Sequence, residues 1–127
     1  MKQLKFLAVI ISLGLALTTN LTSAADNPES IKLALEQTIA KLEESLAAVS
    51  KGEDKQKIAD LIVEARQSQK GISTSDSKVS VKRSQSNHKL VEARTTILDG
   101  DLKGGEALLK EALAGYKEVQ EKFNAAH

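Results

Sequence analysis

The sequence predicts an all-α protein, an antiparallel up-down-up-down four-helix bundle made of two helical hairpins. In four segments, apolar residues recur every three or four positions, which is the periodicity of one helix face. Glycines and short polar stretches separate the segments. The pattern of Lys41–Glu44 returns 48 residues later as Lys89–Glu92. Gly52 returns in the same way as Gly100, so we expect one helical hairpin to occur twice.

Residues 1–25 are predicted to be a signal peptide. Lys2 and Lys5 precede an apolar run of 12 residues, Phe6–Leu17, and small residues follow a short polar stretch. The run is shorter than the roughly 20 residues that span a bilayer, so an uncleaved anchor is the less favoured alternative. The chain has no Cys, which excludes a lipoprotein. We expect cleavage after Ala24 or Ala25, and a mature protein that is periplasmic in a Gram-negative source and otherwise secreted.

The bundle is predicted to span residues 26–127, and its first hairpin residues 27–72. Asn27, Pro28 and Glu29 form a helix start, with a capping side chain, a proline in the first turn and an acid at the positive end of the helix dipole. Gly52 is expected to end this helix in the left-handed conformation. The next helix can start at Asp54.

A polar loop at residues 73–77 is predicted to join the second hairpin, residues 78–125. The first helix of the second hairpin begins after Asp76 or Ser77 and ends at Gly100. Asp101 can cap the last helix. The last helix has the most regular apolar stripe in the chain. Gly115 interrupts that helix. A glycine that faces a neighbouring helix would allow close approach, but for Gly115 we favour tolerance on the solvent face. Two hairpins that pair only in a dimer are the alternative architecture.

Composition excludes several classes of function. Without Cys there are no disulfides, thiolate metal sites or cysteine nucleophiles. The chain has 18 basic and 17 acidic residues, and losing the two lysines of the signal peptide leaves it close to neutral. A near-neutral domain offers no general footprint for nucleic acid. Ser84 and Ser86 lie near His88, but no third group is positioned to make a catalytic triad, so we expect no enzymatic activity.

Four residues are the candidate metal ligands. His88 and Glu92 are four apart and share one helix face, and Asp60 and Glu64 have the same spacing on the preceding helix. If the two faces met, an imidazole and three carboxylates could ligate a divalent metal ion. A solvated polar face is the favoured alternative, and no other cofactor is indicated.

The third helix carries the candidate partner-binding residues, which are basic: Lys78, Lys82, Arg83 and Lys89. They could dock an acidic partner protein or an anionic surface. The favoured alternative is charge complementarity within the bundle, because the first and last helices are rich in glutamate.

At its hairpin turns the chain resembles the small metal-binding protein family of bacterial periplasmic four-helix bundles. The matching segments are Lys41–Gly52 and Lys89–Ala112, with Ala-rich helical hairpins and glycine at the turns. The resemblance implies a periplasmic bundle that binds divalent metal ions through histidines. This chain departs from the family because only His88 occupies such a helical position, with Lys41, Lys89 and Lys110 at comparable polar sites.

Two functions follow as expectations. The first is a non-enzymatic periplasmic bundle with weak divalent-metal binding, as the resemblance implies. The second is a structural or interaction module whose basic third helix contacts an envelope partner or an anionic surface. In either case we expect no transmembrane segment after signal cleavage, and a monomer or weak homodimer.

Overall fold

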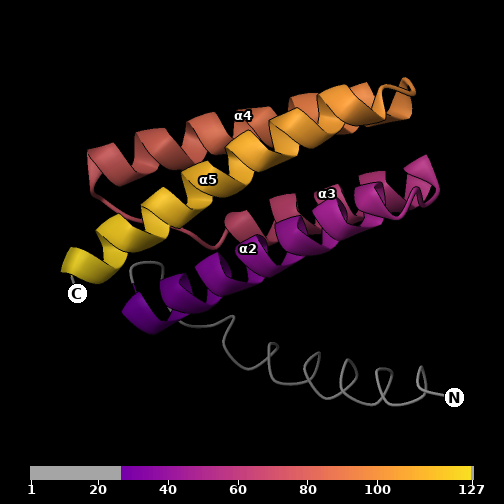
Figure 1. The fold of residues 1–127 in the computed structure, drawn as a ribbon. Helices are drawn as coiled ribbons and strands as arrows, with labels where there is room; N and C mark the ends of the chain where they lie inside the picture. Colours follow the sequence, from indigo (N-terminus) through magenta and orange to yellow (C-terminus); the bar gives the residue numbers. More distant parts are fainter. Residues whose placement is uncertain (1–26, 127) are drawn as a thin grey trace, which may run out of the picture.

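Four helices build the part of the chain that the computed structural model describes, residues 27–126 (Figure 1). They are α2 (Pro28–Ser50), α3 (Lys55–Gln69), α4 (Ser77–Leu98) and α5 (Leu102–Ala126). The same residues contain no β-strand. The predicted all-α class and four-helix bundle are therefore confirmed, whereas the predicted signal peptide lies outside the described residues.

Each helix starts at a side chain that accepts hydrogen bonds from the first free backbone N–H groups. In α2, Asn27 Oδ1 accepts from the N–H of Glu29 at 2.9 Å and of Ser30 at 3.4 Å. Aspartate oxygens do the same for the other helices, each with one bond of 2.9–3.0 Å, at Asp54, Asp76 and Asp101. Such a cap stabilises a helix by about 1 kcal/mol. All four starts lie where the sequence predicts a helix to begin, and of the two residues considered for α4, Asp76 is the cap.

The two hairpin turns have the same pattern of backbone hydrogen bonds. Gly52 and Gly100 have φ angles of 70° and 99°, in the left-handed region that glycine adopts without steric cost. At each turn, the glycine N–H and the following N–H bond back to carbonyls near the helix end, as in a Schellman motif. The glycine turn that the sequence predicts to occur twice is thus present in the backbone hydrogen bonds.

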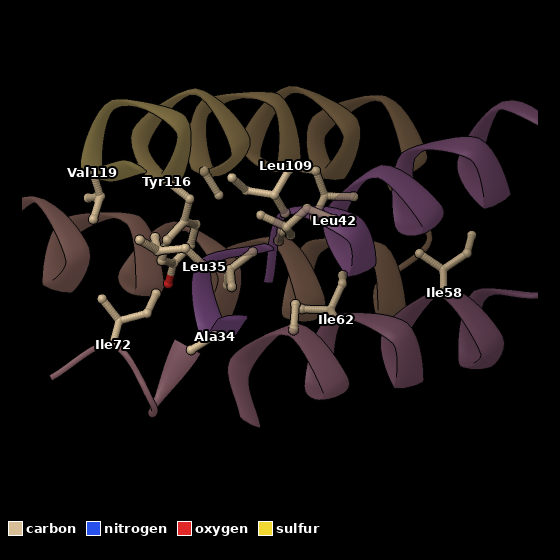
Figure 2. Close-up of a cluster of buried hydrophobic side chains, with 14 of the residues drawn as sticks. Ala34, Leu35, Leu42, Ile58, Ile62, Ile72, Leu109, Tyr116 and Val119 are labelled. Atoms are coloured by element: carbon tan, nitrogen blue, oxygen red, sulfur yellow. The ribbon is translucent and has the colours of Figure 1, made fainter. Parts of the chain in front are cut away.

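The four helices pack in a ring, in which α2 contacts α3, α3 contacts α4, α4 contacts α5, and α5 returns to α2. Their apolar faces point inward to one core (Figure 2). The side chains labelled there are all at most 7% exposed: Ala34, Leu35, Leu42, Ile58, Ile62, Ile72, Leu109, Tyr116 and Val119. Ile72 belongs to the loop after α3, so this loop is anchored in the core as well.

Contacts within each hairpin have the order expected of antiparallel helices. Lys82 contacts Glu118, and Lys89, further along α4, contacts Glu111, which is earlier in α5. In the first hairpin, Lys41 pairs with Glu64, while Ala34 lies beside Gly71. The up-down-up-down order of the whole bundle remains a prediction.

The expectation for Gly115 is wrong, because this residue lies where α5 approaches α4. A Cβ atom at position 115 would collide with Ser86 Oγ and would lie 3.1 Å from Ser86 Cβ. A Cβ atom at Gly105 would likewise collide with the side chain of Ile97. The two glycines sit ten residues apart on the α4 side of α5, so the absence of side chains there allows the close packing of the second hairpin.

Candidate binding surfaces around α4

His88 and Glu92, the first pair of metal candidates, lie on the outer face of α4. Their side chains are 71% and 46% exposed, and His88 Nε2 is 3.2 Å from Glu92 Oε2. The spacing of four residues places them one helical turn apart. This pair has the geometry expected from the sequence, with one imidazole and one carboxylate that solvent can reach.

The second pair, Asp60 and Glu64, is used in other contacts. Glu64 Oε1 is 2.8 Å from Lys41 Nζ on α2, and this hydrogen bond raises the pKa of Lys41. Asp60 Oδ1 accepts a hydrogen bond of 3.0 Å from Gln56 Nε2. Within residues 27–126, no three His, Asp or Glu side chains are grouped so that they could hold a metal ion. The four candidates are therefore not gathered into one site, because α3 directs Glu64 toward α2.

The basic residues of α4 divide between two neighbouring helices. Lys82 Nζ is 3.4 Å from Glu118 Oε1, and Lys89 Nζ is 3.0 Å from Glu111 Oε1, so both lysines lean toward α5. The hydrogen bond to Glu111 also raises the pKa of Lys89. Charge complementarity within the bundle, the alternative favoured by the sequence, thus accounts for these two lysines.

Arg83 points the other way, toward α3. Its Nη1 donates a hydrogen bond of 2.8 Å to Gln69 Oε1, and the buried hydroxyl of Tyr116 lies 3.4 Å from the same oxygen. Burial raises the pKa of Tyr116 well above its ordinary value of 10.0, and the nearby charges of Arg83 and Arg66 oppose that rise. The four basic candidates therefore do not form a single surface.

Lysines and one exposed valine line a shallow groove between α4 and the C-terminal half of α5. It has a volume of about 390 Å³ and is lined by Ser77, Lys78, Val81, Lys82, Gln85 and Lys122. A second hollow of about 290 Å³ shares Lys82 and Gln85 with it and extends past Gly115. We call the two together the α4–α5 groove.

The positive charge of this groove lies in its wider part, because the second hollow is lined by two lysines and two glutamates. Its wider part contains three lysines and no acidic residue. Glu118, at the edge, is 3.4 Å from Lys82 and 3.9 Å from Lys122, so one carboxylate serves two lysines. Among residues 27–126, Lys78 has no ion pair. Sequence reasoning found Lys78, Lys82 and Lys89 but missed Lys122 and Gly115, whose position opposite α4 depends on how the helices pack.

Comparison with known proteins gives no relative: no family model, curated protein or solved structure matches the chain. The resemblance to the small metal-binding protein family therefore stays an interpretation of the hairpin turns. In the part of the chain that the structure describes, no helix combines the length and the apolar character needed to cross a bilayer.

Proposed function

We propose that the mature chain is a non-enzymatic protein of the bacterial envelope that binds an acidic segment of a partner protein in the α4–α5 groove. The apolar run of residues 6–17, with its flanking lysines, supports export. The location, the signal peptide and the partner are all parts of this proposal.

The observation that carries the proposal is the position of Val81. Of the large apolar side chains between residues 27 and 126, only Val81 and Val91 are exposed, at 55% and 37%, and both are on α4. Val81 alone lies in the groove, next to Lys78 and Lys82. An exposed apolar side chain surrounded by cations suits a segment that presents both apolar and acidic side chains.

The ion pairs along the groove do not prevent such binding. Exposed pairs between lysine and glutamate contribute roughly 0–1 kcal/mol, so Lys82 can exchange Glu118 for a carboxylate of the partner at small cost. Lys78 needs no exchange, because no carboxylate of residues 27–126 pairs with it. In the wider part of the groove the partner would therefore meet one unpaired lysine and two weakly held ones.

Site-specific photo-crosslinking in cells of the source organism tests the proposal. A photo-reactive amino acid at position 81 should give an adduct with one protein, whereas the same amino acid at position 91 should not. The two positions are on one helix, about 15 Å apart along its axis. The double variant Lys78→Glu/Lys82→Glu should abolish the adduct at position 81, and Lys32→Glu/Lys110→Glu, a matched change on other helices, should retain it.

Three results would contradict the groove as the binding surface. They are equal adducts from positions 81 and 91, an adduct that survives reversal of Lys78 and Lys82, and labelling of lipid alone at position 81. The last result, together with sedimentation of the mature chain on phosphatidylglycerol vesicles, would point to a membrane surface as the occupant.

Weak divalent-metal binding at His88 is the second candidate function. It is favoured by the 3.2 Å approach of His88 Nε2 to Glu92 Oε2, which places two donor groups on one exposed turn. Two donors leave the remaining coordination positions to water, so we expect at most one site of micromolar or weaker affinity for Cu²⁺, Ni²⁺ or Zn²⁺.

Titration calorimetry on the tag-free mature chain measures this binding. His88→Ala should remove the heat of binding, whereas Glu64→Ala, which changes the other candidate pair, should leave it unchanged. Several tight equivalents would show that carboxylates elsewhere bind metal. The absence of any heat would count against this second function and leave the groove as the better account of the protein.

A further inference from the structure

All three arginines of the chain are on α3 and α4, two helices that pack against each other. Arg66 is on α3, and Arg83 and Arg94 are on α4. On α4, the spacing of Arg83, Asn87 and Arg94 puts them on one side of the helix. Arg83 shows that this side faces α3, because it donates to Gln69. Glu64, by contrast, is turned toward α2 by its pair with Lys41.

Arg66 and Arg83 come from different helices but act on the same buried residue, Tyr116. Gln69, the hydrogen-bond partner of Arg83, is one turn after Arg66 on α3. Both guanidinium groups are near enough to Tyr116 for their charges to act on its hydroxyl. Asn87 is one turn after Arg83 on α4, at the level of Arg66 if the two helices run in opposite directions. With the antiparallel order predicted for the bundle, two positive charges and one amide share a short stretch of the interface.

These groups have polar atoms that the bundle leaves without partners. Arg66 Nε, Arg94 Nε and Asn87 Oδ1 are all buried and make no hydrogen bond. No arginine of residues 27–126 is in an ion pair, although lysines are paired with glutamates at the other three helix interfaces. Buried donors without acceptors, next to a second positive charge, destabilise the free protein and favour an anion that accepts from them.

We propose that the α3–α4 interface binds one inorganic phosphate ion between Arg66, Arg83 and Asn87. The guanidinium fork matches the oxygens of phosphate, and a phosphate dianion balances two guanidinium charges. Near neutral pH inorganic phosphate also keeps a proton, so its P–OH group donates to Asn87 Oδ1 while its other oxygens accept from the arginines. A carboxylate or sulfate ion carries no proton at this pH and would leave Asn87 Oδ1 unpaired.

The test uses the side-chain Nε–H signals of the arginines in ¹H–¹⁵N NMR spectra of the mature chain. Sodium phosphate replaces sodium chloride at constant ionic strength and pH 7. The Arg66 signal should shift and saturate, whereas the Arg94 signal should not. Arg94 is the matched control, because its Nε is equally unpartnered but lies about 16 Å along α4 from Arg83. The variants Arg66→Lys and Arg94→Lys assign the two signals.

Variants and other anions decide the identity of the ligand. Arg66→Gln should weaken phosphate binding about tenfold or more, as expected for the loss of a charged hydrogen-bond donor. Lys82→Gln, which removes a charge facing α5, should leave the affinity unchanged. If Arg66→Gln fails to fold, Arg66→Lys keeps the charge but loses the fork, and should also bind more weakly when followed at the backbone signal of Asn87.

The proposal is overturned if Arg66 and Arg94 respond alike, if Arg66→Lys binds phosphate as tightly as the unchanged chain, or if sulfate or acetate binds as tightly as phosphate. Phosphoserine tests whether a phosphate ester can replace the inorganic ion. Its phosphate group is largely without a proton at pH 7, so phosphoserine should bind more weakly than inorganic phosphate. If phosphoserine binds more tightly than inorganic phosphate, the ligand of this site is a phosphorylated partner and not the free ion.

Discussion

Tyr116 is the largest fully buried side chain of the bundle, and its hydroxyl reaches a polar group inside the core. Gln69 Oε1, itself in a buried residue, faces both this hydroxyl and Arg83. Three helices, α3, α4 and α5, are therefore linked at one buried oxygen. Because a buried polar group without partners is costly, this contact favours the packing that brings these three residues together.

The ionisation of Tyr116 predicts how stability depends on pH. Burial raises the pKa of Tyr116 in the folded protein above its ordinary value of 10.0, which the unfolded chain retains. This raised pKa costs no stability below pH 10. Above pH 10, the unfolded chain releases the proton more readily than the folded one, so stability falls as the pH rises.

Tyr116→Phe removes this dependence, and the difference can be measured by urea unfolding between pH 9 and 11.5. The unchanged chain should lose up to about 1.4 kcal/mol more per pH unit above pH 10 than the variant. Lysines also titrate in this range, but they do so in both proteins. If the free energy of unfolding of both proteins depends on pH in the same way, the hydroxyl of Tyr116 reaches solvent in the folded protein.

At the scale of the helices, the starts and ends could be predicted from the sequence because each depends on a few neighbouring residues. Asn27 caps its own helix through the N–H groups two and three residues on. Gly52 and Gly100 end helices by their own backbone conformation. None of these features requires knowledge of which helices pack together.

The division of charges on α4 could not be predicted in the same way. Lys82 and Arg83 are adjacent in sequence, yet one pairs with α5 and the other with α3. Successive residues of a helix point about 100° apart, so the pattern shows that the two side chains diverge. Which neighbour each one meets depends on the order of the four helices around the core, and that order is set by the whole chain.

Gly115 gives a prediction about the contact between α4 and α5. Gly115→Ala should destabilise the protein by about 1–3 kcal/mol, the range for inserting an atom into a filled interface, although alanine favours a helix by about 1 kcal/mol. The reason is the collision of the new Cβ with Ser86 Oγ. Thermal and urea unfolding measure the change.

A double-mutant cycle identifies the cause. Adding Ser86→Ala removes the oxygen nearest to the new methyl group and should restore part of the lost stability, while Ser86→Ala alone should have a small effect. If Gly115→Ala raises the stability instead, α4 and α5 lie further apart than the structure places them.

At the scale of the whole molecule, the buried residues of both hairpins belong to one core within a single chain. Leu42 of the first hairpin and Leu109 of the second are both fully buried. The ring of contacts closes where α2 meets α5. An architecture in which the hairpins pair only through a dimer would need these faces to be covered by a second copy, whereas here each hairpin covers the other.

The bundle should therefore unfold as one unit, at a temperature that does not depend on protein concentration. Leu42→Ala and Leu109→Ala should each cost about 2–5 kcal/mol, the range for truncating a buried leucine. Because the core is shared, each change should speed hydrogen exchange of the most protected amides in both hairpins alike. Lys82→Ala, at a partly exposed ion pair, should cost under about 0.5 kcal/mol and serves as the control. Exchange that accelerates only in the mutated hairpin, or a midpoint that rises with concentration, would show that the hairpins fold separately and join between chains.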